Sequence, residues 1–201
     1  MTAALKLLRF LGPTLLFFGT FVVLPPLLMS YFNNSLDNNM LWIYFSCIMY
    51  SLVILLTLRR KKFSYTPKDG FIITFLTWVF ISILASLPFM TNNLTFYDAL
   101  FEAVSGLTTT GSTVINDLSL LPDHVLLYRQ LLQWSGGVGL VIVVLAIIPA
   151  VSGGMKVLQA ETAGFADKSF SPRLRETARS LLKFYVLITL ACVFSYWLAG
   201  M

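Results

Sequence analysis

Long apolar blocks recur along this chain, and their length restricts the folds open to it. A helix that crosses a bilayer needs ~20 consecutive, mainly apolar residues. Blocks that meet or approach this length occupy residues 10–32, 41–58, 71–90, 125–151 and 181–199. Only 11% of the residues are charged, whereas soluble domains average about a quarter. The sequence therefore predicts an all-α integral membrane protein with about five transmembrane helices.

The basic residues predict how these helices are oriented. Every lysine and arginine except Arg129 lies before the first block, between the second and third, or from the end of the fourth to the start of the fifth. Cytoplasmic loops of membrane proteins carry an excess of Lys and Arg. We therefore expect a cytoplasmic N-terminus, with segments 33–40 and 91–124 outside. The net charge of +5 then reflects topology and argues against a nucleic-acid partner.

The sequence gives little support to an enzyme. Cys47 and Cys192 lie inside apolar blocks and form no CxxC motif. His124 has no His or Cys neighbour and is interpreted as a loop residue. No carboxylate pair, His cluster or Ser/His arrangement stands out in the blocks, where such groups usually mark chemistry or ion paths. We expect no catalytic residues and no cofactor.

One short segment departs from the pattern of long blocks. Residues 96–107 predict a helix of about three turns between the third and fourth blocks. Thr95 can cap this helix, and Asp98 lies in its first turn, where the helix dipole favours an acid. Twelve residues are too few to cross a bilayer. The segment is therefore predicted to be re-entrant, dipping in as a pore helix and returning as extended backbone.

The run GLTTTGSTV, residues 106–114, forms the predicted return. Non-helical backbone at membrane depth is tolerated only where protein buries it or where it lines a water-filled cavity. Backbone carbonyls in such a filter loop can replace the hydration shell of a potassium ion, and Gly111 permits backbone angles barred to other residues. We expect potassium to bind the carbonyls of Thr109, Thr110 and Gly111. The full predicted filter is Thr108, Thr109, Thr110, Gly111 and Ser112. The alternative is an ordinary extracellular loop.

The start of the fourth block combines glycines with a charge. Gly136, Gly137 and Gly139 would let another segment approach closely, so we expect tight packing beside the short helix. Arg129 either extends to the outer surface or pairs with an acid of the outer segment. The candidate acids are Asp98, Glu102 and Asp117.

Four stretches together carry a family resemblance. They read YDALFEAVSGLTTTGSTV, LLYRQLLQWSGGVGLVIVVLAIIP, GGMKVLQAETAG and SPRLRETARSLLKFYVLITLACVFSYWLAGM. In this order they resemble the Trk potassium-uptake family, within the Trk/Ktr/HKT superfamily, and most closely its membrane subunits of the TrkH/TrkG type. The resemblance covers nearly the whole chain and is strongest from about residue 95 onward.

The resemblance implies a potassium-channel-like fold with four span–pore helix–span repeats around one pore. Two transmembrane helices would precede the repeats within residues 1–66, and the first repeat would occupy 67–151. Residues 152–180 would be a cytoplasmic linker, and 181–201 the first span of the second repeat. One filter segment of four cannot close a pore. The chain is therefore expected to be the N-terminal portion of a longer protein, or else to assemble in several copies.

The resemblance also implies a function, which is potassium uptake across the bacterial inner (plasma) membrane. A glycine at position 111 favours potassium, because a serine there accompanies sodium preference in related transporters. The implied partners are a second copy in a homodimer, membrane lipids, and a cytoplasmic TrkA-type regulatory subunit that binds NAD or ATP. The basic stretch 168–183 serves either topology and anionic-lipid contact or the docking of that subunit.

Other functions remain open from the residues alone. The chain could be a non-conducting membrane scaffold or accessory subunit, or a sodium-permeable relative. A secondary transporter with discontinuous helices would interrupt a full span near the midplane, whereas this Thr/Gly run follows a separate short helix. Channel-like conduction and symport are not distinguished.

Overall fold

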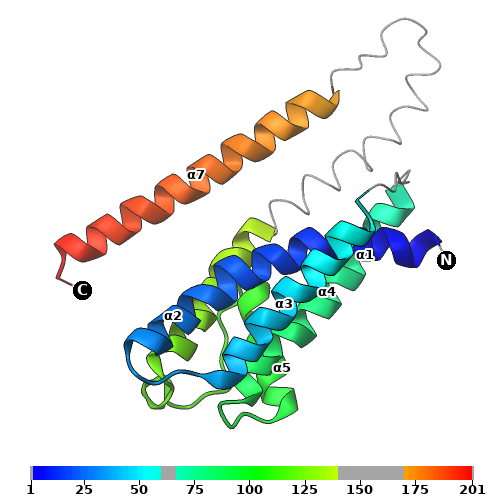
Figure 1. Ribbon diagram of the computed structural model, residues 1–201. Coiled ribbons are helices and arrows are strands. Elements are labelled where there is room, and N and C mark those ends of the chain that lie inside the picture. Colours follow the sequence, from blue (N-terminus) through cyan, green and yellow to red (C-terminus); the bar gives the residue numbers. More distant parts are fainter. Residues whose placement is uncertain (1, 60–66, 140–169, 201) are drawn as a thin grey trace, which may run out of the picture. The chain divides into compact units, whose positions relative to one another are not determined.

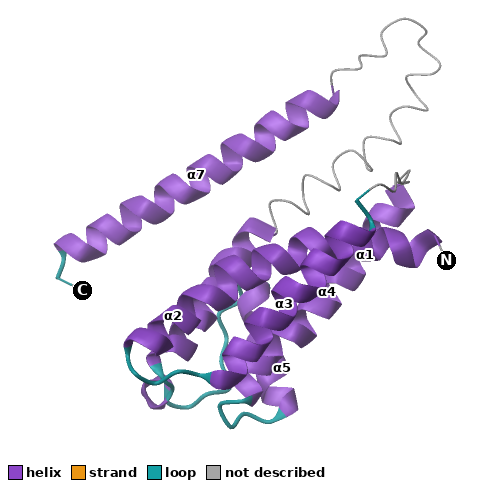
Figure 2. Cartoon of the chain, in the orientation of Figure 1, coloured by secondary structure: helices purple, strands orange, loops and turns teal. Residues whose placement is uncertain are grey.

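The computed structural model describes residues 2–59, 67–139 and 170–200 of the chain (Figure 1). Every regular element within these ranges is helical (Figure 2). Residues 1–137 form one compact unit, and residues 138–201 belong to a second. We describe each unit by itself.

The predicted all-α membrane fold is confirmed. Four helical stretches in the described ranges are long and apolar enough to cross a membrane: Ala4–Phe32, Asn38–Thr57, Asp69–Met90 and Arg179–Leu198. They match the first, second, third and fifth of the predicted spans. The described part of the fourth predicted span, 125–139, lies in a helix that begins at residue 123, and residues 140–151 of this prediction lie outside the described residues.

The first span is longer than predicted and contains a change of helix type. It begins with α1 (Thr2–Phe17), passes through the π-helical segment η1 (Phe18–Val23), and ends as α2 (Leu24–Phe32). Pro25 and Pro26 lie in the first turn of α2. Proline lacks an N–H and clashes with the carbonyl four residues back, and the wider π turn that precedes it relieves this conflict. The chain therefore stays helical across both prolines.

Small residues bring the first two spans together. Helix α3 (Asn38–Thr57) lies along α1, and a Cβ atom added at Gly12 would come within 3.0 Å of the Ile54 side chain. The Ser51 hydroxyl, which is buried, donates to the Gly12 carbonyl at 2.7 Å. Close backbone approach at small residues, supplemented by hydrogen bonds, is the usual basis of helix packing in membranes.

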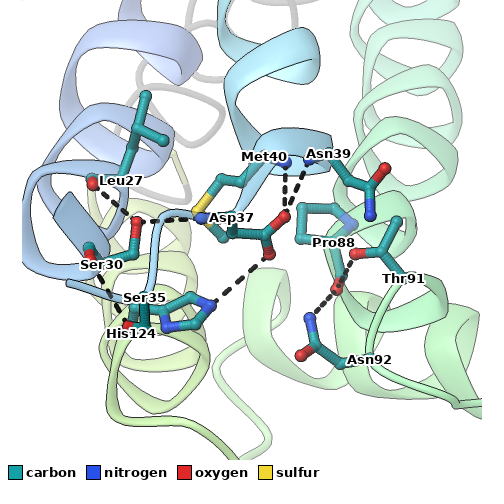
Figure 3. Close-up of polar contacts among 10 residues, drawn as sticks. All are labelled: Leu27, Ser30, Ser35, Asp37, Asn39, Met40, Pro88, Thr91, Asn92 and His124. Carbon is teal, nitrogen blue, oxygen red and sulfur yellow. Dashed lines mark hydrogen bonds and ion pairs between the residues drawn. The ribbon is translucent and has the colours of Figure 1, made fainter. Parts of the chain in front are cut away.

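At one end of this unit, which we call the loop end, the connections 33–37 and 91–95 lie together (Figure 3). The Asp37 carboxylate caps α3 by accepting from the N–H groups of Asn39 and Met40 at 2.9 and 3.0 Å. Its second oxygen lies 3.5 Å from Nε2 of His124. The loop end thus joins the N-terminal pair of spans to the helix that starts at residue 123.

The prediction of a loop position for His124 is wrong. His124 lies in the first turn of the helix 123–139 and is only 7% exposed. Pro122 directly precedes this helix, and Asp123 opens it with an acid, both of which favour a helix start. These signals place the start of the helix one residue before His124, and the buried imidazole then lies beside the Asp37 carboxylate.

The short helix packs between the third span and the helix 123–139. Helix α4 (Pro67–Met90) is followed by α5 (Phe96–Leu107), the green helix in Figure 1. The Tyr128 hydroxyl donates to the Ala85 carbonyl at 2.9 Å, and its ring meets that of Phe89 edge-on. The core at this point includes α5 residues with small side chains. Its buried members are Phe89, Ala99, Ala103, Leu107, Val125, Tyr128 and Leu132.

Helix α7 (Phe170–Leu198) makes up most of the described part of the second unit, which begins at residue 138. Its candidate span, Arg179–Leu198, matches the block predicted to open a second repeat. Residues 170–180, predicted as linker, are helical and extend this span toward the N-terminus. The rest of the predicted linker, 152–169, lies outside the described residues.

Substitution of Gly136 tests the packing between α5 and the helix 123–139. A Cβ atom at this position would lie 2.2 Å from the Leu107 carbonyl oxygen, which is backbone and cannot rotate away. We expect Gly136→Ala to lower the free energy of unfolding by about 1–3 kcal/mol through overpacking. Thermal unfolding of the purified protein in detergent measures this loss.

Gly70→Ala is the matched control, because nothing lies within 4 Å of a Cβ added at Gly70 in the first turns of α4. Alanine is the better helix former, so this variant should be neutral or slightly stabilising. Equal effects of the two substitutions would contradict the close contact.

Candidate functional site

Helix α5 begins as the sequence predicts. Thr95 is the N-cap, and its hydroxyl oxygen accepts from the Asp98 N–H at 3.3 Å while donating to the Asp98 carboxylate at 2.6 Å. The predicted bounds of this helix and its cap are confirmed. The cap fixes the start of α5 at the loop end and leaves the other end of the helix to enter the bundle.

The end of α5 is closed by a Schellman motif. Thr109 N–H donates to the Gly106 carbonyl at 2.9 Å, and Thr110 N–H donates to the Ser105 carbonyl at 3.0 Å. The motif requires a left-handed residue at Thr109, whose φ is +60°. Glycine is the usual residue there, and a β-branched side chain costs about 1–2 kcal/mol. Such strain is characteristic of functional segments.

Beyond the motif the chain turns back along α5. The end of α5 touches Gly136, whereas Gly111 lies near Gln133, one turn closer to the loop end. The Ser105 hydroxyl donates to the Ser112 carbonyl at 2.6 Å. Helix α5 and residues 108–114 therefore form a hairpin. The chain runs away from the loop end as α5 and comes back toward it as non-helical backbone in residues 108–114, which we call the return.

A buried ion pair holds this return in place. Glu102, with no exposed surface, accepts from Arg129 Nε at 2.9 Å, and Arg129 is only 5% exposed. Of the alternatives left open for Arg129, the structure shows the inward one, with Glu102 as the partner. Loss of one member of a buried pair typically costs about 3–5 kcal/mol, because the other charge is left uncompensated.

Both partners also bind the backbone of the return. The second Glu102 oxygen, Oε1, accepts from the Thr113 hydroxyl at 2.5 Å and from the Val114 N–H at 2.8 Å. Arg129 Nη2 donates to the carbonyls of Gly111 and Ser112 at 3.1 and 3.4 Å. The pair thus engages four consecutive residues, from Gly111 to Val114.

The predicted filter residues differ in the partners of their carbonyls. Within the described residues, no hydrogen-bond donor reaches the carbonyl oxygens of Thr109 or Thr110. The Gly111 carbonyl, in contrast, already accepts from Arg129 and keeps one lone pair. Side chains 108–112 are all exposed, and the Thr108 and Thr110 hydroxyls lie 2.9 Å apart.

The sign of φ alternates along this segment. It is −85° at Thr108, +60° at Thr109, and +75° at Gly111, while Thr110 and Ser112 are not among the positive-φ residues. The expected freedom of Gly111 is therefore used, and Thr109 adopts a similar backbone without being glycine.

The remaining acids of the outer segment do not join this site. Asp98 serves the α5 cap. Asp117 caps the short 3-10 helix η2 (Leu118–Leu120), and hydrogen bonds from the Ser119 side chain and backbone lower the pKa of its carboxyl group. Asp117 thus stays ionised on the exposed surface. Within the described ranges, no group of three or more His, Cys, Asp or Glu could hold a metal ion.

The sequence contains a signal that Glu102 is buried and paired. Glu102 lies on the α5 face formed by Ala99, Ala103 and Gly106, all of which are buried. An acid among small apolar residues on a buried face needs a cation or several hydrogen bonds. Arg129, the basic residue that departs from the charge asymmetry, is the obvious partner, but sequence alone does not give their distance.

Apolar spans packed against a short helix and its ion-paired return define a polytopic membrane protein. Residues 37–201 match the family model of TrkH, a cation transport protein. The chain is 36% identical to the Trk system potassium uptake protein TrkH of Salmonella typhimurium over 198 residues. That match covers 96% of this chain and 41% of the relative.

Two further comparisons agree. The chain is 43% identical to the Trk system potassium uptake protein TrkG of Escherichia coli over 150 residues, covering 72% of this chain and 31% of that protein. The crystal structure of the potassium transporter TrkH from Vibrio parahaemolyticus superposes with a TM-score of 0.76 at 33% identity. It covers 98% of this chain and 40% of the solved chain. This protein belongs to the TrkH family, and it spans about two fifths of the length of the TrkH relatives.

Replacement of Thr109 tests whether the return is strained. Glycine accepts a positive φ without steric cost, so Thr109→Gly should raise the free energy of unfolding, or leave it unchanged where chain entropy offsets the relief. Thr110→Gly is the matched control, because Thr110 lacks a positive φ and its hydroxyl contacts Thr108. Thermal unfolding should rank Thr109→Gly above Thr110→Gly. The reverse order would show that Thr109 is not strained.

Proposed function

We propose that this chain supplies one span–pore helix–span repeat of a potassium uptake pore, with residues 108–112 as one filter segment. The observation that carries the proposal is the hairpin: a short helix leads inward, and a strained return leaves adjacent carbonyl oxygens, among them those of Thr109 and Thr110, without hydrogen-bond donors in the described residues. The names of the relatives support potassium as the transported ion.

The depth of the hairpin supports a pore rather than a surface loop. Gly136 contacts the end of α5. It lies about 20 Å from residue 123, the start of its own helix, because an α-helix rises 1.5 Å per residue. The hydrocarbon core of a bilayer is about 30 Å thick. A non-helical backbone at that depth must line a water-filled cavity or be covered by protein. Residues 108–112 are exposed in this chain, so we propose that they face the shared pore axis.

The chemistry of the segment suits a monovalent cation. Carbonyl and hydroxyl oxygens can replace the hydration shell of potassium without binding it so tightly that it cannot leave. We propose the carbonyls of Thr109 and Thr110 as the principal ligands, with Gly111 contributing its remaining lone pair. The process is transport without a chemical reaction, so the chain has no catalytic residues.

The surroundings of the pore follow from the same proposal. We place the chain in a bacterial inner membrane with its N-terminus in the cytoplasm, supported by the distribution of basic residues. Its partners are a second copy, membrane lipids, and a TrkA-type cytoplasmic subunit that binds NAD or ATP. The relatives' names, which refer to a Trk system, support a multi-component assembly.

Gly111→Ser tests the filter in the complete reading frame that contains these residues. A side chain at φ +75° strains the backbone by about 1–2 kcal/mol, and the added hydroxyl changes the ligand set. We expect the ratio of potassium to sodium uptake to fall by roughly tenfold, the equivalent of 1.4 kcal/mol. The measurement is ion uptake by a bacterial strain that lacks its own potassium uptake systems.

Gly200→Ser is the matched control, since Gly200 has a φ of +78° and lies after α7, with open space around it. It should leave the ratio unchanged. A normal ratio in Gly111→Ser, at wild-type abundance in the membrane, would refute the filter assignment. Absence of potassium uptake by the wild-type protein would refute the proposed function as a whole.

A further inference from the structure

We propose that Glu102 and Arg129 are positioning residues for ion selection, which rests on the proposed function and adds a determinant of selectivity outside the predicted filter. The buried pair fixes residues 111–114, and through them the angle at which the free carbonyls of Thr109 and Thr110 are presented. Neither side chain contacts the ion in this account.

Apart from their bond to each other, Glu102 and Arg129 form their hydrogen bonds with the return and not with the described residues of the spans that surround it. Glu102 Oε2 accepts from Arg129, whereas Oε1 accepts two hydrogen bonds from Thr113 and Val114. Arg129 turns Nε to the carboxylate and Nη2 to the carbonyls of residues 111 and 112. A guanidinium suits this task because its donors diverge from one rigid plane.

The hydrogen-bonded carbonyls of Gly111 and Ser112 directly follow those of Thr109 and Thr110, which have no donor in the described residues. The Thr110 and Gly111 peptide groups are joined at the Gly111 Cα, so φ and ψ of Gly111 set the angle between their two carbonyls, and the Arg129 hydrogen bond fixes one of the two. Ion selection depends on the number and orientation of the coordinating carbonyl dipoles. Release of the return would therefore alter selectivity before it abolished the fold.

The pair also sets the electrostatic field behind the filter. An unpaired guanidinium next to a cation path would repel the transported ion, and its effect would be strong in a medium of low dielectric constant. Glu102, which is fully buried, neutralises Arg129 at 2.9 Å. The pair thus supplies directional donors for the carbonyls without leaving a net positive charge at the site.

Stability alone is a weak explanation for this pair. Buried ion pairs can often be replaced by apolar residues of similar volume at no cost in stability. The Glu102–Arg129 pair lies where α5, the return and the helix 123–139 meet, and most of its other hydrogen bonds go to the backbone of the return. This placement favours a role in holding that backbone.

The test compares three variants of the complete protein. Glu102→Gln keeps an oxygen acceptor but removes the negative charge. Arg129→Lys keeps the positive charge but removes the planar guanidinium and its diverging N–H donors. Tyr128→Phe is the matched control, because it deletes a buried hydrogen bond of the neighbouring residue to α4 and leaves the return untouched. Cells without their own potassium uptake systems are assayed for uptake of potassium, rubidium and sodium at measured protein abundance.

We expect Glu102→Gln and Arg129→Lys to lower the potassium-to-sodium ratio at least fivefold and to raise the KM for potassium. Tyr128→Phe should keep the wild-type ratio and KM. Wild-type selectivity and KM in both variants of the pair would overturn the proposal, as would a change in Tyr128→Phe of the same size. If one variant of the pair does not reach the membrane, the ratio and KM of the other variant decide the test. If neither variant reaches the membrane, the pair is required for folding, and the positioning role is overturned.

The same assay separates this proposal from the proposed function. If the wild-type protein fails to take up potassium, the proposed function fails. If the wild-type protein is potassium-selective and both variants of the pair match it, only the positioning role fails.

Discussion

The backbone of residues 108–114 must satisfy its polar groups without a helix or a sheet, and the structure around it is arranged to meet this need. The N–H groups of the four residues from Thr108 to Gly111 donate to carbonyls in the last turn of α5, and the Val114 N–H donates to Glu102. The carbonyls of Gly111 and Ser112 are taken by Arg129, with Ser105 as a second donor to Ser112. Among the predicted filter residues, the carbonyls of Thr108, Thr109 and Thr110 have no donor within the described residues. In our account the transported ion takes those of Thr109 and Thr110.

This arrangement depends on close packing at small residues. Gly136 of the helix 123–139 leaves space for the Leu107 carbonyl of α5. Gly106 of α5 in turn lies against Leu132 of the helix 123–139. Without these two glycines, α5 would be held farther from the helix 123–139, and Arg129 would no longer reach the return. The N-terminal spans are joined to the same helix at the loop end, where Asp37 contacts both the start of α3 and His124.

The sequence predicts the local elements well because their signals are local. The bounds of α5 follow from the Thr95 cap and the Thr/Gly run, and the spans follow from bilayer-length apolar blocks. The start of the first helix at Thr2 was missed because polar and basic residues interrupt the apolar pattern there. Part of that basic charge is used within the bundle, since Lys6 pairs with Asp69 of α4 at 2.8 Å.

Features set by tertiary contacts could not be fixed in the same way. The residues alone leave three acids as candidate partners of Arg129, and the buried His124 lies beside Asp37, which is far away in sequence. The left-handed Thr109 was also unexpected, because threonine is rarely chosen where glycine is sterically preferred. The sequence therefore indicates the kind of site, and the ion pair that holds it emerges only from the packed structure.

The most direct test of the account is a crystal structure of the complete protein with thallium or rubidium in place of potassium. We predict anomalous density on the pore axis, in direct contact with the carbonyl oxygens of Thr109 and Thr110 and with Glu102 and Arg129 still paired behind them. A structure in which residues 108–112 face bulk solvent, with no ion density beside those two carbonyls, would contradict the account.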